Sequence, residues 1–243
     1  MKKIIVVWLA LVAGLCLCLG GCEEDHQGGG QMTTKEKKLV KVIKEYTIND
    51  IYGSSSHDID EVQIVWDGEK VIRIGNTPVV YNGDNIVSIG GYQFSYSNDR
   101  LRRMWSSSGS FETSWTFNYN SDGVLWSFTY LEENLQEAGS NFTYTSNFTW
   151  RQGNLVAAWD GDEQYDYDSY INPYSMLPMA VVLFVETERY YYLSKNNVVK
   201  INEDGDESQW TYEYDNDRYP VKKIEYYSDS YEEQTIVTNY YYQ

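Results

Sequence analysis

The chain has 243 residues, with 36 acidic against 19 basic side chains and a formal charge of −17 at pH 7. A charge of this sign and size repels nucleic-acid phosphates, so nucleic acid is excluded as a partner. The 24 tyrosines, 8 tryptophans and 7 phenylalanines favour strands over a helical bundle. The length suits one domain with a core large enough to fold alone.

The N-terminal segment is typical of a secretory signal. Met1-Lys2-Lys3 is basic, and the apolar run Ile4–Leu19 is shorter than the roughly 20 residues of a spanning helix. Leu19-Gly20-Gly21-Cys22 then resembles the lipobox of bacterial lipoproteins. The resemblance implies that residues 1–21 are a cleaved signal peptide and that Cys22 carries a lipid. The chain that remains has no second cysteine, so no disulfide forms within it.

Residues 22–34 are predicted to form a lipidated, flexible tether with an r.m.s. reach of roughly 20 Å. Glu23-Glu24-Asp25 directly follows the cysteine and resembles the export signal of surface-exposed lipoproteins in Bacteroidota. The alternative is an ordinary acidic linker in solvent. These features predict a protein of the outer membrane that is lipid-anchored, exposed at the cell surface and bound to the membrane through Cys22.

Residues 35–243 are predicted to form a single β-meander domain, because one short hairpin unit recurs along them. Each unit has an apolar-x-aromatic strand, a polar turn and an apolar strand. Trp66-Asp67-Gly68 leads into Val71–Ile74, and Tyr81-Asn82-Gly83 leads into Ile86–Ile89. Asp-Gly and Asn-Gly supply the positive φ that tight hairpin turns require.

Aromatic side chains alternate with polar ones along these strands. Trp115, Phe117 and Tyr119 share one face, as do Trp126, Phe128 and Tyr130, and as do Trp210, Tyr212 and Tyr214. This period of two is typical of an antiparallel sheet buried on one face. We therefore predict an all-β, antiparallel up-and-down meander of about fourteen strands, curled or closed into a barrel-like roll because so long a sheet must remove its edges.

One segment breaks the hairpin rhythm. Asp160–Tyr170 is acidic and tyrosine-rich, and the run Met176–Val185 is nearly all apolar. Pro173 and Pro178 interrupt the segment, and Pro178 lies within the apolar run, which disfavours a central strand. The segment is either a long connection whose apolar part plugs one end of the sheet or a binding loop. In the second interpretation the ligand region is Trp159–Pro178. Its candidate contacts are Trp159, Tyr165, Tyr167 and Tyr170.

The hairpin unit resembles the Tyr-Asp repeats of bacterial surface proteins. Combined with the lipobox, Asn172-Pro173-Tyr174, Leu177-Pro178 and Ser194-Lys195-Asn196-Asn197, it resembles a Bacteroidota surface lipoprotein family of unknown function with a porin-like fold. The resemblance covers roughly residues 35–243. It implies a rolled β-meander and supplies no catalytic residues.

No constellation in the sequence predicts a reaction, a cofactor or a metal centre. His57 lies in a serine-rich turn that we interpret as solvated, because adjacent residues of one loop rarely form a catalytic triad. Asp160–Glu163 and Asp204–Glu207 carry carboxylates of the kind that calcium requires, but neither has EF-hand spacing. We interpret both as acidic turns in solvent.

These features predict a non-enzymatic cell-surface lipoprotein that serves as a binding or accessory module for a glycan or an envelope protein. A transmembrane β-barrel pore is the first alternative, and it is opposed by charges within strands at Arg102, Arg103, Lys222 and Lys223. A glycan hydrolase is the second, supported only by the number of carboxylates. The sequence leaves the oligomeric state open.

Overall fold

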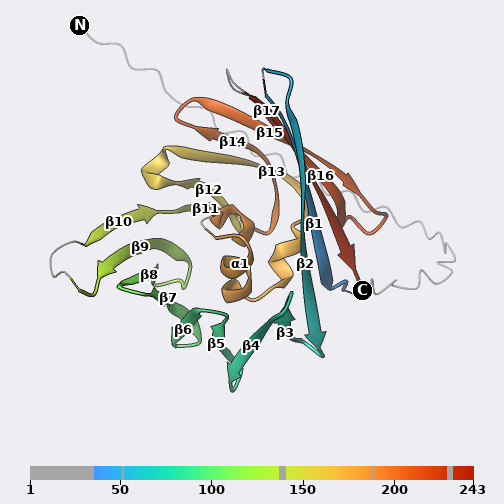
Figure 1. Cartoon of the computed structure of the whole chain (residues 1–243). Helices are drawn as coiled ribbons and strands as arrows, with labels where there is room; N and C mark the ends of the chain where they lie inside the picture. The colour runs from blue at the N-terminus through green and yellow to red at the C-terminus, as the bar shows by residue number, and fades with distance from the viewer. Residues whose placement is uncertain (1–35, 51, 137–140, 188, 229–231) are drawn as a thin grey trace, which may run out of the picture. The chain divides into compact units, whose positions relative to one another are not determined.

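The computed structural model describes residues 36–50, 52–136, 141–187, 189–228 and 232–243, which belong to one compact unit, Glu36–Gln243. The predicted signal peptide, the tether and Cys22 lie outside the described residues. The unit is almost entirely β-structure, which confirms the predicted fold class (Figure 1). Among the described residues, no helix is long and apolar enough to cross a membrane.

Seventeen strands are present in the described part of the chain. They are β1 (Leu39–Asp50), β2 (Ser55–Asp67), β3 (Lys70–Ile74), β4 (Thr77–Asn82), β5 (Asn85–Ile89), β6 (Tyr92–Ser97), β7 (Arg100–Ser108), β8 (Phe111–Tyr119), β9 (Leu125–Asn134), β10 (Phe142–Asn147), β11 (Thr149–Arg151), β12 (Asn154–Ala158), β13 (Glu163–Ile171), β14 (Asn196–Glu203), β15 (Asp206–Tyr214), β16 (Pro220–Ser228) and β17 (Glu232–Tyr242). The helical elements are η1 (Trp159–Gly161), η2 (Pro173–Met176), α1 (Met179–Val185) and η3 (Tyr190–Leu193).

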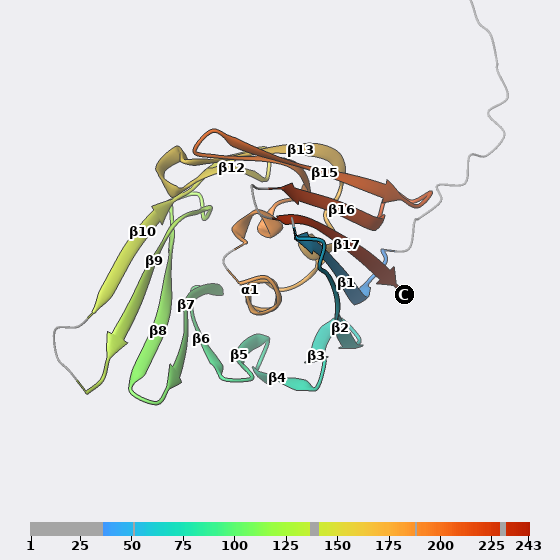
Figure 2. The same cartoon turned by 45° about the horizontal axis from the view of Figure 1, so that its top comes forward.

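The strands form an antiparallel meander that closes on itself. Strands that are consecutive in the chain pair with one another, and β17 pairs with β1, with Ile236 opposite Tyr46. The N–H of Phe148, between β10 and β11, donates to the carbonyl of Trp126 at 2.8 Å, so this stretch continues along β9. The result is one nearly closed, barrel-shaped sheet (Figure 2).

The strand count exceeds the predicted fourteen partly because β13 was not foreseen. Residues 160–170 were expected to interrupt the meander, and this prediction is wrong for Glu163–Ile171, which pairs with β14. The flanking prolines lie just beyond the strand. They begin the helical segment instead, with Pro173 in the first turn of η2 and Pro178 directly before α1.

The predicted face assignment is confirmed for β8 and corrected for β9. Phe117 is 0% exposed and Trp115 is also buried, so the aromatic face points into the barrel. Trp126, in contrast, is 47% exposed. A register shift between Asn118 and Tyr119 brings Leu125 to the inward position, and Trp126 turns outward.

A set of inward aromatic side chains, which we call the aromatic belt, stabilises the bulges. At six of the register shifts one backbone carbonyl next to the bulge accepts a hydrogen bond from an aromatic residue of a following strand. The pairs are Trp66 Nε1 to Leu39 O at 2.9 Å, and the hydroxyls of Tyr81 to Val71 O at 3.1 Å, Tyr119 to Leu101 O at 2.9 Å, Tyr167 to Leu155 O at 2.6 Å, Tyr212 to Val198 O at 2.9 Å and Tyr242 to Pro220 O at 2.7 Å. The recurring aromatic of the sequence unit thus satisfies buried polar backbone groups.

The segment 172–194, which we call the plug, fills the interior of the barrel. Its helices η2, α1 and η3 lie inside the ring of strands (Figure 2). Ala180, Val181, Val182 and Leu183 of α1 are all buried, which explains why this run is apolar on every side. The structure therefore shows this apolar run as a plug of the sheet. The plug lies inside the barrel rather than only at one end.

Polar side chains join the two ends of the plug to each other and fix the Ser194 end to the barrel wall. Asn172 donates from Nδ2 to the carbonyls of Tyr192 and Ser194 at 2.8 and 2.7 Å. The Oγ of Ser194 accepts from the N–H of Leu155 at 3.0 Å and donates to the hydroxyl of Tyr167 at 2.9 Å. The Asn-Pro-Tyr and Ser-Lys-Asn-Asn motifs are therefore structural clamps.

We expect the protein to lose stability steeply above pH ~10, because burial raises the pKa of many tyrosines. Burial raises the pKa of Tyr96, Tyr119 and Tyr227 to about 12 in each case. An unfolded tyrosine loses its proton near pH ~10, whereas these keep theirs. Their stabilisation is therefore complete below pH ~10 and is lost as the pH rises toward 12, by less than about 1.4 kcal/mol per pH unit per tyrosine, because each of the three side chains is only half-buried and solvent screens it.

Urea denaturation in steps from about pH 8 to about pH 11 measures this loss. Tyr119→Phe should reduce the loss of unfolding free energy above pH ~10 by the contribution of one tyrosine. Tyr226→Phe, whose side chain is 51% exposed, is the matched control and should leave that loss unchanged. A free energy of unfolding that stays constant across this range would contradict the burial of these hydroxyls.

Candidate functional site

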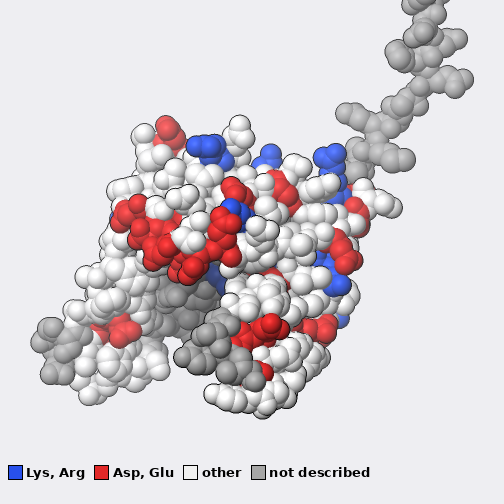
Figure 3. Space-filling model, turned by 90° about the horizontal axis from the view of Figure 1, so that it is seen from above, with Lys and Arg blue, Asp and Glu red and all other residues white. Residues whose placement is uncertain are grey.

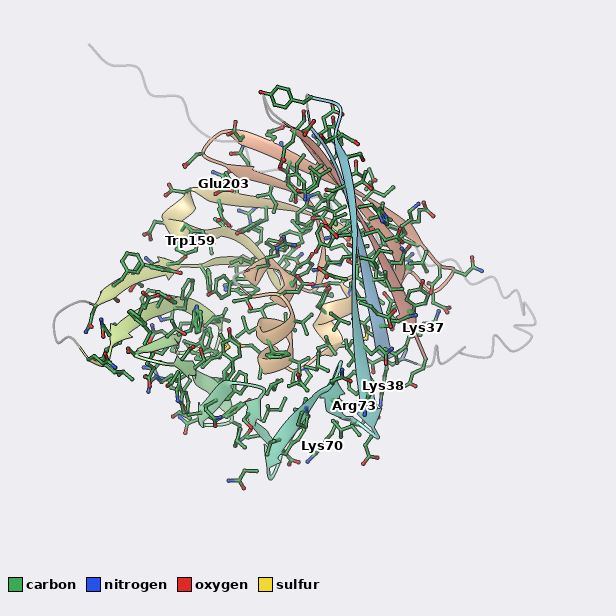
Figure 4. All side chains as sticks on the ribbon, in the orientation of Figure 1. Lys37, Lys38, Lys70, Arg73, Trp159 and Glu203 are labelled. Atoms are coloured by element: carbon green, nitrogen blue, oxygen red, sulfur yellow. The ribbon has the colours of Figure 1, made fainter. Side chains whose placement is uncertain are left out.

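A cleft of about 530 Å³ opens at the end of the barrel where the β14–β15 hairpin turns. Its volume is in the range of roughly 300–1,000 Å³ that is typical of small-ligand sites. Glu203 lies at this end (Figure 4). The lining residues come from β13 to β16 and from the plug: Glu163, Arg189, Tyr191, Ile201, Glu203, Asp204, Asp206, Ser208, Trp210 and Tyr227.

The rim of the cleft is acidic. Glu163 begins β13, and Glu203, Asp204 and Asp206 belong to the facing hairpin, so the two acidic turns noted in the sequence meet at one opening. Seen from above, carboxylates gather on this end of the molecule (Figure 3). Burial raises the pKa of Glu163, and the nearby charge of Glu203 adds to the rise. Among the described residues, no three His, Cys, Asp or Glu side chains converge to hold a metal ion.

Arg189 is the cation of the cleft. It is half-buried in the turn between α1 and η3, where its N–H donates to the carbonyl of Glu186 at 3.2 Å. Burial alone would lower the pKa of Arg189, but Tyr191, Tyr192 and Glu186 raise it above its ordinary value, so the guanidinium stays charged. Its ion pair with Glu186 is long, at 4.0 Å.

Glu186 is already saturated by closer partners. Lys44 of β1 contacts its carboxylate at 2.7 Å, and the hydroxyl of Tyr174 donates to Oε1 at 2.5 Å. The guanidinium of Arg189 therefore does not serve to neutralise Glu186. Among the described residues, the guanidinium of Arg189 has no hydrogen-bond partner. Arg189 lines the cleft.

A second ion pair lies deeper in the same wall. Lys223 and Glu225 of β16 are fully buried and 2.8 Å apart, and the ammonium of Lys223 also donates to the hydroxyl of Tyr192 at 2.7 Å. Burial lowers the pKa of Lys223, and the charge of Glu225 offsets part of that fall. Of the two strand charges Lys222 and Lys223 that oppose a membrane barrel, only Lys222 lies on the outer face, because Lys223 is buried inside.

The four aromatic residues proposed from sequence do not form one site. Tyr165 is 6% exposed, packs 5.5 Å from Tyr191 between ring centroids and donates to Glu163, so it supports the wall of the cleft. Tyr167 belongs to the aromatic belt. Tyr170 stacks on Tyr214 at 4.1 Å, toward the other end of β13.

Trp159 lies at the same end of the barrel as Glu203 (Figure 4). Its ring packs edge-on against Phe128 at 5.6 Å, and its backbone φ of 51° ends β12 in a tight turn. It is half-buried in the barrel wall and does not line the cleft. Of the predicted region, Glu163 is the residue that reaches the cleft.

The residues that sequence reasoning missed are Arg189, Tyr191, Trp210 and Tyr227. Trp210 was assigned to the inward face, and that is confirmed, but nothing in the pattern places it at an opening. Arg189 carried one usable signal, since it follows an apolar run that had already been interpreted as internal. The hairpin Asp204–Glu207 was noted for its acids and does reach the cleft through Asp204 and Asp206.

A smaller cleft of about 260 Å³ opens beside Met179 and Leu193. It is lined largely by apolar side chains, among them Val124, Trp150 and Leu177. Because it brings together no acidic or basic side chain, it has little means of orienting a polar ligand. The acid-rimmed cleft is therefore the candidate site.

The fold and the cleft define a porin-like, all-β barrel with an internal plug. A porin-like protein from Bacteroides vulgatus ATCC 8482 has a similar structure, with a TM-score of 0.53 and 15% identity over 86% of this chain and 99% of that one. A porin-like protein from Bacteroides uniformis ATCC 8492 matches with a TM-score of 0.35 and 9% identity over 84% and 96%. No family model matches the chain, and no curated protein matches it.

We expect Lys223→Ala to lower the free energy of unfolding by about 3–5 kcal/mol, because it leaves Glu225 buried without its cation. The neighbouring Lys222 is the matched control. It forms an exposed pair with Glu213 at 3.2 Å, so Lys222→Ala should cost only about 0.2–1 kcal/mol. Denaturant melts of both variants measure the difference. Equal losses would contradict the inward placement of Lys223.

Proposed function

We propose that this protein is a non-enzymatic, surface-exposed lipoprotein of the outer membrane that uses its acid-rimmed cleft to bind part of a glycan or of an envelope protein. The observation that carries the proposal is the cleft itself. It combines an arginine with donors available to a ligand, aromatic walls and a rim of carboxylates in one opening. Such a combination suits recognition of a polar ligand by hydrogen bonds and ring contacts.

The position of the chain's entry into the barrel supports an outward-facing cleft. The N–H of Lys38 donates to the carbonyl of Gln243 at 3.1 Å, so both ends of the described unit meet. Lys37 and Lys38 lie at the end of the barrel opposite Glu203 (Figure 4). A lipid on Cys22 would attach the barrel through this end, and we propose that the cleft lies at the end away from the attachment point.

The distribution of charge favours the same orientation. At the entry end, acids are paired with lysines: Lys37 with Asp215 at 2.7 Å, Lys38 with Glu69 at 2.7 Å and Lys70 with Asp84 at 2.9 Å. At the cleft end Lys200 pairs with Glu207 at 2.5 Å, whereas within the described part of the chain the rim acids Glu163, Glu203, Asp204 and Asp206 form no ion pair. Anionic headgroups would repel the cleft end more strongly than the entry end.

The alternative of a pore finds less support. The plug occupies the barrel interior, and its Tyr174, Tyr190 and Tyr192 are buried. On the outer surface, register aligns Glu213, Lys222, Asn239, Ile43 and Glu61 across five neighbouring strands. A membrane-spanning barrel needs an apolar outer band about 25 Å tall, so a charged row of this kind favours an outer surface in water.

We expect Cys22→Ala to abolish incorporation of labelled fatty acid and release the protein from the membrane fraction. The physical reason is that a thioether-linked lipid is the anchor that the lipobox predicts. Cys18→Ala, which changes a cysteine within the signal peptide, is the matched control and should label normally. Labelling that persists in Cys22→Ala would contradict the anchor.

The ligand-binding part is tested with a glycan array and with purified envelope proteins. The double variant Asp204→Asn/Asp206→Asn keeps the shape of the rim, since asparagine tolerates the positive φ of 52° at residue 204, but removes two charges. It should weaken any specific binding, whereas Asp84→Asn at the opposite end should not. Binding that both variants retain would move the site elsewhere, and turnover of a polysaccharide would contradict the non-enzymatic role.

A further inference from the structure

We infer that the ligand of the cleft is a peptide that ends in lysine or arginine and has a free C-terminal carboxylate. This inference rests on the proposed function and narrows its ligand from glycan or protein to one chemistry. The cleft presents two opposite charges to a ligand. Arg189 belongs to the plug, and the carboxylates belong to the hairpins at the opening.

Arg189 is suited to a carboxylate. A guanidinium binds a carboxylate through two parallel N–H bonds, and this planar geometry is specific to that class of group and to phosphate. The closer partners of Glu186 are Lys44 and Tyr174, at 2.7 and 2.5 Å, which leaves the guanidinium 4.0 Å from that carboxylate. The short contacts that the guanidinium lacks within the described residues are available to a ligand.

The rim decides which carboxylates can reach Arg189. A simple anion must pass Glu163, Glu203 and Asp206, whose charges repel it. A simple cation is attracted by the carboxylates but repelled by Arg189 in the same cleft. A ligand that carries a carboxylate and a cation a few bonds apart satisfies both charges, with its carboxylate on Arg189 and its cation among the acids.

The walls identify the remainder of the ligand. Tyr191, Trp210 and Tyr227 line the same cleft as Arg189. Their rings suit the apolar stem of a lysine or arginine side chain, whose charged end then reaches the rim. A C-terminal lysine places an α-carboxylate and an ammonium at the two ends of such a stem. Neutral sugars have neither charge and would leave Arg189 unpaired.

The experiment is isothermal titration of the full-length protein in detergent with four probes. They are the tripeptide Gly-Gly-Lys, its C-terminal amide, the isosteric Gly-Gly-norleucine, and xylohexaose as a neutral glycan. We expect Gly-Gly-Lys to bind best, and loss of the carboxylate or of the ammonium to weaken binding by about ten- to hundredfold.

Two variants and a control then assign the charges. Arg189→Gln should weaken binding of Gly-Gly-Lys and remove its advantage over the amide, while keeping its advantage over norleucine. Asp204→Asn/Asp206→Asn should also weaken binding of Gly-Gly-Lys, but it should remove the advantage over norleucine and keep the advantage over the amide. Arg73→Gln, an exposed arginine on β3, should change neither, and thermal unfolding of all three checks that each is folded.

Equal affinity for the free acid and the amide, or unaltered binding by Arg189→Gln, would overturn the inference. The outcome also separates it from the proposed function. If xylohexaose or an envelope protein binds in a manner sensitive to the rim variant while the peptide does not, the peptide assignment fails and the binding role stands. If no probe or envelope protein responds to either variant, both fail.

Discussion

The structure depends on the need to fill the interior of a long, closed meander. A barrel of about eight strands is filled by its own side chains, whereas rings of 16–18 strands leave an open lumen. This chain closes seventeen strands, many of them short, and so encloses more space than its strand side chains occupy. The plug resolves the problem with a segment of the same chain. Because α1 is surrounded by strands, its residues Ala180–Leu183 are apolar on every face, and the sequence shows a run rather than a stripe.

The plug is held in one position by the motifs Asn172-Pro173-Tyr174 and Ser194-Lys195-Asn196-Asn197, which are part of the family resemblance in the sequence. Asn172 and Ser194 stand at the two ends of the plug, and hydrogen bonds tie them to each other and to β12 and β13. The aromatic belt does the equivalent for the wall, since at six of the bulges a tyrosine or tryptophan donates a hydrogen bond to a backbone carbonyl. The same repeated aromatic residue therefore explains both the hairpin pattern and the curvature. These motifs specify a scaffold, and they carry no chemistry of their own.

The sequence predicts those features of the fold that depend on neighbouring residues, and it fails for those that depend on distant ones. Hairpins and inward aromatics were predictable, because Asp-Gly turns and a period of two are properties of neighbouring residues. Trp126 was misplaced because it is the extra residue of a bulge in β9 itself, and no alternation in the sequence reports that shift. Lys223 and Glu225 were not foreseen inside the barrel, since charges on a strand ordinarily face water. The cleft was beyond reach for a related reason: Arg189 and Asp206 meet only after the ring has closed.

The charges inside the barrel connect the scaffold to the candidate site. Lys44, Arg189 and Lys223 face Glu186 and Glu225, so among these described interior groups one positive charge lacks a counter-charge. Apolar residues would fill the same space at equal or better stability, because buried ion pairs repay their desolvation poorly. The ion pairs of Glu186 and Glu225 with lysines leave Arg189 as the cation that borders the cleft. Its charge is then answered from outside the core, by the carboxylates of the rim at long range and by a carboxylate of a ligand at short range. On this view the buried network fixes the position and the charge of the guanidinium, and the barrel, the plug and the rim are successive layers around it.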